Sequence, residues 1–220
     1  QGADRYMAKF AHIEDIHRRI FAAMLANMDD SVGKVMQRLK DLSLQKNTLV
    51  FFFADNGGPT RELTSSNAPL RGEKGQVYEG GLRVPFLMSW PGVIPASMTY
   101  SKPVSTLDLF PTACSAAGAK LPKKKMDGVN ILPFLTGKKD KEPHQYLFWR
   151  IGDRHALRKG EWKILRYRNK PWSLFNLKND MGENTNLANQ MPSQTAELSK
   201  LWDSENAGMI DPSWTPKRKK

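Results

Sequence analysis

Apolar residues between positions 6 and 44 recur every three or four residues, with charged residues between them. This spacing is typical of a helix that buries one face. The sequence therefore predicts one long amphipathic helix over residues 6–44, and the polar run Asp29-Asp30-Ser31 is the place where we expect any break. The apolar positions are Ile13, Ile16, Ile20, Met24, Met28, Val32, Val35, Met36 and Leu39.

The next apolar run, residues 48–54, shows no alternation and ends abruptly at Asp55-Asn56-Gly57-Gly58. A strand that is buried on both faces gives this pattern, which favours a parallel or mixed sheet covered by helices. A second strand is predicted over residues 84–90. A helical pattern follows over residues 105–117, where Pro111 marks a local break or the start of a turn.

Later segments are shorter and are separated by turn residues. They predict an antiparallel meander with strands near residues 145–149, 155–158, 162–167 and 172–176, covered by a helix over 195–206. A segment rich in Pro, Gly and Lys over 121–141 separates the two parts. The predicted fold class is α/β. Residues 1–120 would form part of a mixed sheet flanked by helices, and residues 121–220 a small α+β subdomain with an antiparallel sheet.

Composition and charge narrow the possible partners. The chain has 220 residues, 40% of them hydrophobic, which is enough for a packed core, and its net charge of +12 favours anionic partners. The basic runs at 123–125, 138–139 and 217–220 lie beside Pro or Gly, as solvated loops do, and no nucleic-acid motif accompanies them. No apolar run approaches the roughly 20 residues of a membrane span. The single cysteine, Cys114, excludes an internal disulfide, and its apolar neighbours predict a buried thiol.

The turn at residues 55–58 is the first candidate for chemistry. In an open α/β sheet, ligands bind just beyond the carboxyl ends of the strands. Asp55 and Asn56 would offer two hard oxygen donors there, suited to Ca²⁺ or Mg²⁺, and Gly57-Gly58 would let the backbone turn tightly. The same residue types are also preferred in an ordinary β-turn, so both interpretations stay open on this segment alone.

The loop that follows carries a family resemblance. Residues 67–85 read Asn-Ala-Pro-Leu-Arg-Gly-Glu-Lys-Gly-Gln-Val-Tyr-Glu-Gly-Gly-Leu-Arg-Val-Pro. The string resembles the sulfatase signature, in which a glycine-rich loop presents a lysine and continues through Glu-Gly-Gly and Arg-x-Pro into a strand. Further matching segments lie in the same order at 28–33, 47–50, 89–92, 107–112, 127–130, 160–163 and 174–184. The chain thus resembles the carboxyl-terminal half of an arylsulfatase-like member of the alkaline phosphatase superfamily.

This resemblance implies roles for particular residues. Asp55 and Asn56 would form the second half of a Ca²⁺ (or Mg²⁺) site, and Lys74 would contact the sulfate of the substrate. Arg71, Glu79 and Arg83 would be ion-pair partners that hold the loop. The implied activity is that of a sulfuric ester hydrolase acting on a sulfate ester such as a sulfated carbohydrate, with a periplasmic or secreted location.

The family's nucleophile has no counterpart in this sequence. Sulfatases use a formylglycine made from the first residue of a Cys/Ser-x-Pro-x-Arg motif, and neither the segment at Ser89 nor that at Cys114 matches it. We therefore expect the formylglycine and the other metal ligands in an amino-terminal half of the same protein, and we expect this chain alone to be inactive. The first residue, Gln1, fits that hypothesis. The four histidines are expected to be ordinary surface or core residues.

Two other functions stay open. One is a noncatalytic module that binds sulfated polysaccharide through the basic surface. The other is a phosphoesterase of the same superfamily. The sequence does not identify the ester, the oligomeric state or the choice between Ca²⁺ and Mg²⁺, because variable loops form the pocket walls.

Overall fold

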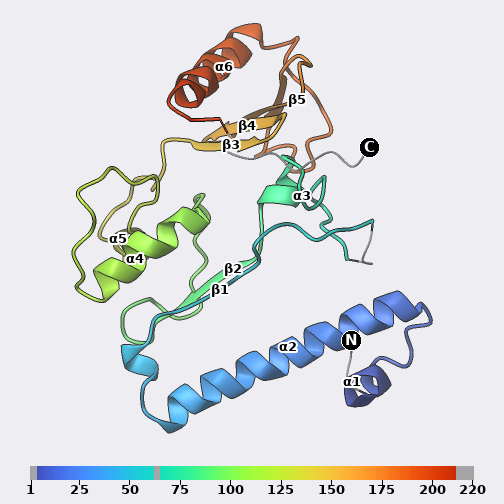
Figure 1. Cartoon of the computed structure of the whole chain (residues 1–220), viewed down its shortest axis with the longest axis vertical. Helices are drawn as coiled ribbons and strands as arrows, with labels where there is room; N and C mark the ends of the chain where they lie inside the picture. The colour runs from blue at the N-terminus through green and yellow to red at the C-terminus, as the bar shows by residue number, and fades with distance from the viewer. Residues whose placement is uncertain (1–3, 62–64, 212–220) are drawn as a thin grey trace. The chain divides into compact units, whose positions relative to one another are not determined.

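A computed structural model describes residues 4–61 and 65–211. These residues belong to two compact units, Gln1–Gln145 and Tyr146–Lys220, each of which we describe by itself. Their helices and strands are drawn in Figure 1. The boundary predicted at residues 120 and 121 concerns a catalytic domain and its subdomain, and it stays a prediction.

The first unit begins with α1 (Asp4–Lys9) and α2 (Ile16–Asp41). Asp15 caps α2, because its carboxylate accepts a hydrogen bond of 2.7 Å from the Arg18 amide. The predicted single helix is therefore wrong: the chain turns at residues 10–15, and α2 runs unbroken through residues 29–31. Asp30 has a partner outside its own helix, since Tyr6 of α1 donates a 2.7 Å hydrogen bond to its carboxylate.

The two predicted strands of this unit are confirmed. β1 (Val50–Phe53) follows the 3₁₀ turn η1 (Gln45–Asn47) and pairs antiparallel with β2 (Phe86–Ser89), with Val50 opposite Ser89. Burial on both faces is wrong for the described residues, because Phe52 is 38% and Leu87 58% exposed. A pair of strands cannot cover its own two faces. The α/β class is confirmed, although the described sheets are antiparallel.

Short helices complete the first unit. They are α3 (Glu79–Leu82), η2 (Thr106–Asp108), α4 (Leu109–Ala116) and α5 (Leu132–Leu135). The predicted helix over 105–117 is confirmed as η2 and α4. Pro111 lies in the first turn of α4, where its missing N–H removes no intrahelical hydrogen bond. Cys114 is free but only partly buried, which corrects the prediction of a buried thiol.

The second unit confirms the predicted meander and its covering helix. Strands β3 (Leu147–Ile151), β4 (Arg154–Lys159), β5 (Trp162–Tyr167) and β6 (Ser173–Asn176) pair in chain order, and α6 (Pro192–Ala207) lies over the sheet in Figure 1. The core consists of residues exposed by no more than 1%: Leu157, Ile164, Leu174, Leu198 and Trp202. Burying side chains of this size contributes about 1.5–3 kcal/mol each.

Candidate functional site

The turn that follows β1 carries the predicted metal ligands. Backbone hydrogen bonds continue beyond the strand, from the Ala54 amide to the Pro85 carbonyl and from the Gly57 amide to the Gly81 carbonyl, each 3.2 Å long. Asp55 is exposed and Asn56 is half-buried, with its Nδ2 donating to the Gly57 carbonyl at 3.1 Å. Among the described residues, neither the Asp55 carboxylate nor Asn56 Oδ1 accepts a hydrogen bond. Two hard oxygen donors are thus available on consecutive residues of the turn.

Glycines let this turn lie directly against α3. A Cβ placed on Gly57 would lie 1.7 Å from the Gly80 carbonyl oxygen, and one on Gly80 would lie 2.5 Å from the Gly72 carbonyl oxygen. Real Cβ atoms do not come so close, so the backbones approach to a distance that only glycine permits. Gly80 in turn donates a 2.6 Å hydrogen bond to the Arg71 carbonyl. The Glu-Gly-Gly sequence therefore fixes the position of the turn.

Asn67 joins the turn to the loop that carries Lys74. Its Oδ1 accepts from the Gly58 amide at 3.0 Å, while its Nδ2 donates to the carbonyls of Gly58 at 2.9 Å and Gly72 at 3.0 Å. One amide side chain thus uses both of its ends to connect segments that lie before and after it. No local pattern marks Asn67 as a site residue, although it opens the segment that resembles the sulfatase signature.

Glu73 is a second connection, next to Lys74. Its Oε2 accepts from Thr60 Oγ1 at 2.7 Å and from the Arg61 amide at 3.1 Å, and its Oε1 lies 3.0 Å from Arg61 Nε. The hydrogen bond from Thr60, followed by the amide and charge of Arg61, lowers the pKa of Glu73. The role of Glu73 could not be predicted from the sequence, because Thr60 and Arg61 are more than ten positions away.

Lys74 lies in a turn and is exposed. In the described part of the chain its ammonium makes no hydrogen bond or ion pair. Its backbone, by contrast, is held on both sides, by Glu73 before it and by the turn in which the Gln76 amide donates to the Glu73 carbonyl at 2.9 Å. The structure therefore presents an available ammonium on a fixed loop, in the same unit as Asp55 and Asn56.

The three residues predicted to hold the loop by ion pairs, Arg71, Glu79 and Arg83, differ in their contacts and burial. Arg71 stacks its guanidinium on the Tyr78 ring at 4.2 Å, and Glu79 is buried, with 2% exposed. The Arg83 amide donates to the Glu79 carbonyl at 2.7 Å, which closes α3. The ion pairs predicted for Arg71, Glu79 and Arg83 stay a prediction.

The donor set is suited to a hard cation but is small. Among the described residues, no group of three or more His, Cys, Asp and Glu side chains could hold a metal ion. Asp55 and Asn56 are oxygen donors of the type that Ca²⁺ and Mg²⁺ prefer. Two ligands are fewer than the six to eight that Ca²⁺ takes, so a site here would require further ligands.

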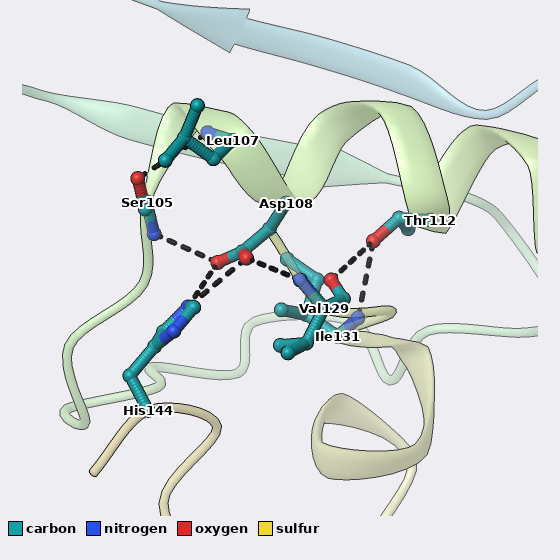
Figure 2. A network of polar contacts seen from close by, with 7 residues as sticks. All are labelled: Ser105, Leu107, Asp108, Thr112, Val129, Ile131 and His144. Carbon is teal, nitrogen blue, oxygen red and sulfur yellow. Dashed lines mark hydrogen bonds and ion pairs between the residues drawn. The ribbon is translucent and has the colours of Figure 1, made fainter. Parts of the chain in front are cut away.

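A buried carboxylate forms a second polar network in the same unit, shown in Figure 2. The Asp108 side chain is fully buried and accepts hydrogen bonds of 2.8 Å from the amides of Ser105 and Val129. His144 Nε2 lies 2.9 and 3.0 Å from its two oxygens, and the Ile131 amide donates to Thr112 Oγ1 at 3.0 Å. These contacts hold α4, the segment 128–131 and residue 144 together. His144 thus joins the segment before β3 to the buried carboxylate of Asp108.

The fold and this site together define the class of protein. An α/β chain of helices and antiparallel sheets places an Asp-Asn turn against a glycine-rich lysine loop. The family model named Sulfatase matches residues 1–119, and the model named N-sulphoglucosamine sulphohydrolase, C-terminal, matches residues 72–206. The chain belongs to the sulfatase family.

Relatives and solved structures agree with this assignment. The chain is 37% identical over 204 residues to a sulfatase of Formosa agariphila, covering 79% of this chain and 36% of that protein. It is 34% identical over 208 residues to human arylsulfatase A, covering 81% and 41% of the two chains. The solved structure of Ps i-CgsB in complex with k-i-k-neocarrahexaose matches with a TM-score of 0.90 and 34% identity, over 99% of this chain and 49% of that one.

The matched proteins are longer than this chain. It spans 36% to 41% of the two curated relatives and about half of the solved chain. Within the described ranges, none of the helices is long and apolar enough to cross a membrane.

Proposed function

We propose that this chain is part of a sulfuric ester hydrolase, in which Asp55 and Asn56 are ligands of a Ca²⁺ or Mg²⁺ ion and Lys74 contacts the sulfate group. The observation that carries the proposal is the connection of the Asp-Asn turn to the lysine loop through Asn67 and the packed glycines. Family membership supports the reaction type.

The chemistry of these side chains suits a sulfate ester. A bound divalent ion would supply positive charge that stabilises sulfate oxygens as negative charge moves toward the leaving group. Lys74 would add a second positive charge through its ammonium. The exposed Asp55 carboxylate and Asn56 Oδ1 would hold the ion, and the hydrogen bonds of Glu73 would keep the Lys74 backbone in place.

The nucleophile would come from outside this chain. We propose a formylglycine in an amino-terminal half of the same protein, together with the further metal ligands that two donors require. A structural neighbour solved with a hexaose supports a sulfated carbohydrate as the class of substrate. A periplasmic or secreted location belongs to the same proposal.

The test uses the complete protein that contains this chain, assayed with 4-nitrophenyl sulfate. Lys74→Ala should lower kcat/KM by about 100-fold, since loss of one group that stabilises transition-state charge costs roughly 10²–10³ in rate. Lys46→Ala is the matched control, because Lys46 is also an exposed lysine of the first unit and its backbone carbonyl, not its side chain, binds Trp90. Equal activities of the wild type and the Lys74 variant would contradict the role of this lysine.

Two further measurements separate the alternatives. A paired assay with 4-nitrophenyl phosphate should give lower turnover, and a preference for phosphate would indicate a phosphoesterase. Retention on sulfated polysaccharide without hydrolysis would indicate a noncatalytic binding module.

The proposed metal ligands are tested by thermal unfolding of the complete protein. Added Ca²⁺ should raise its Tm, and Asp55→Ala should reduce this rise.

A further inference from the structure

Arg166 in the second unit lies over two rings of an aromatic cluster. Its Cζ lies 4.3 Å from the centre of the Trp172 ring and 5.2 Å from that of Trp202. Its Nε donates a 3.0 Å hydrogen bond to His155 Nδ1, and the His155 ring stacks on Trp202 with 4.3 Å between centroids. These contacts position the guanidinium, and Arg166 is half-buried.

The charge of Arg166 is not balanced by a neighbouring carboxylate. Among the described residues it has no ion pair, and its two terminal nitrogens donate to no acceptor. The nearby Asp153 lies 3.3 Å from Arg168 and 4.0 Å from Arg154 instead. A guanidinium removed in part from water and left without an anion is unusual, because burying charge is costly unless it is paired.

A second arginine lies in the same row of the sheet. Arg150 is directly opposite His155, which is directly opposite Arg166, so all three side chains are on one face of β3, β4 and β5. Arg150 is bound by Asn206 Oδ1 at 2.8 Å, and its acidic neighbour Asp211 is 3.9 Å away and 98% exposed. The two arginines therefore give this row positive charge. Of the two, and among the described residues, only Arg166 has terminal nitrogens available to donate further hydrogen bonds to an anion.

We propose that Arg166, positioned by Trp172 and His155, binds a sulfate group of a sulfated saccharide. Stacking on an aromatic ring leaves the N–H edge of a guanidinium free, and that edge matches two oxygens of an oxyanion. The choice of a sulfated saccharide over other oxyanions rests on the proposed function. The site lies wholly within the second unit and would bind a sulfate group independently of Lys74.

A purely structural role gives different expectations. If Arg166 only closes the edge of the aromatic cluster, its replacement changes packing and leaves anion binding as it was. Arg166→Lys keeps the charge but loses the planar stack and the two-pronged hydrogen bond. Arg166→Gln removes the charge. Near-UV circular dichroism shows whether the tryptophan packing survives in each variant.

The experiment measures binding to the 220-residue chain, without turnover. Glucose 6-sulfate, glucose and sodium sulfate are titrated while tryptophan fluorescence and the NMR signals of the His155 ring are followed. Glucose 6-sulfate should change both signals, sodium sulfate should compete with it, and glucose should be silent. A bound anion should also raise the pKa of His155, which burial and the charge of Arg166 lower in the free protein.

Variants of Arg166 test whether its guanidinium binds the sulfate group. Arg166→Gln should weaken binding of glucose 6-sulfate by about tenfold or more, the usual loss for a hydrogen bond to a charged group, and Arg166→Lys by less. Arg154→Gln is the matched control, since Arg154 precedes His155 on β4 and faces the other side of the sheet. Equal losses in the Arg166 and Arg154 variants, or binding that both Arg166 variants leave unchanged, would overturn the proposal. Lys74→Ala should not alter these signals, so the two proposals fail separately.

Discussion

Lys163 on β5 and Glu183 in the segment after β6 form an ion pair in which both side chains are fully buried, with 3.0 Å between Lys163 Nζ and Glu183 Oε1. Lys163 belongs to a strand whose neighbours Ile164 and Leu165 are core residues. Glu183 has a backbone φ of 52°, in the left-handed region that side chains rarely adopt. The pair therefore ties an irregular segment to the sheet.

Breaking this pair should destabilise the second unit strongly. Glu183→Gln keeps the size of the side chain but leaves the Lys163 charge buried without its carboxylate, which typically costs about 3–5 kcal/mol. The double variant Lys163→Met/Glu183→Leu should recover much of that loss, since it buries no charge. Urea unfolding followed by tryptophan fluorescence measures both. A single variant as stable as the wild type would show that the charges are not isolated by the fold.

Gly57 and Gly33 should respond to alanine in opposite ways. A Cβ on Gly57 would lie 1.7 Å from a carbonyl oxygen, whereas one on Gly33 would meet nothing within 4 Å. Gly57→Ala should therefore move the turn away from α3 and cost about 1–3 kcal/mol, as overpacking does. Gly33→Ala lies within α2 and should stabilise by about 0.5–1 kcal/mol. Thermal unfolding compares the two, and similar shifts in Tm would contradict the close contact.

Asn67→Asp tests the connection between the turn and the lysine loop. The aspartate can still accept from the Gly58 amide, but it cannot donate to the carbonyls of Gly58 and Gly72. In the complete protein we expect kcat on an aryl sulfate to fall by about tenfold or more, because a small misplacement of a binding group reduces rate steeply. Asn189→Asp, at an exposed position of the second unit, controls for the added charge.

A positioning role predicts a particular pattern in the Asn67 variant. Its activity should fall together with the protection of the Gly58 and Gly72 segments against hydrogen exchange. Lost activity with unchanged protection would reject the structural connection and assign Asn67 another role.

The positions of the helices and strands could be predicted from the sequence better than the burial and contacts of their side chains. Periodicity located the strands of both sheets and α6 because side-chain spacing is a local property. The burial of β1 was wrong because it depends on what packs against Phe52 and Leu87, which no local pattern contains. The break in the first helix was misplaced because Asp30, read as a helix breaker, is bonded to Tyr6 of another helix.

In the candidate site, too, local patterns could be recognised in the sequence, whereas contacts between distant residues could not. Asp55 and Asn56 were singled out because they follow a predicted strand, and Lys74 because its loop resembles a family signature; the roles of all three stay predictions. Asn67 and Glu73 were missed because their roles depend on contacts with residues 5 to 13 positions away. Such contacts form only once the loop is folded, so the residue type gives little sign of them.

The stability of the second unit should depend on the protonation of His155. Burial is the main cause that lowers the pKa of His155, followed by the charge of Arg166. The unfolded chain has the ordinary histidine pKa of about 6.5 and therefore binds the proton first as pH falls. The free energy of unfolding should accordingly be highest above pH ~6.5 and decrease as pH falls toward the lower pKa of the folded state.

His155→Gln, whose side-chain oxygen can still accept from Arg166, should flatten this decrease, and His17→Gln at an exposed position of α2 should leave it in place. Urea unfolding at several pH values, followed by tryptophan fluorescence, gives the comparison, and an equal slope in the wild type and His155→Gln would exclude this histidine as the source.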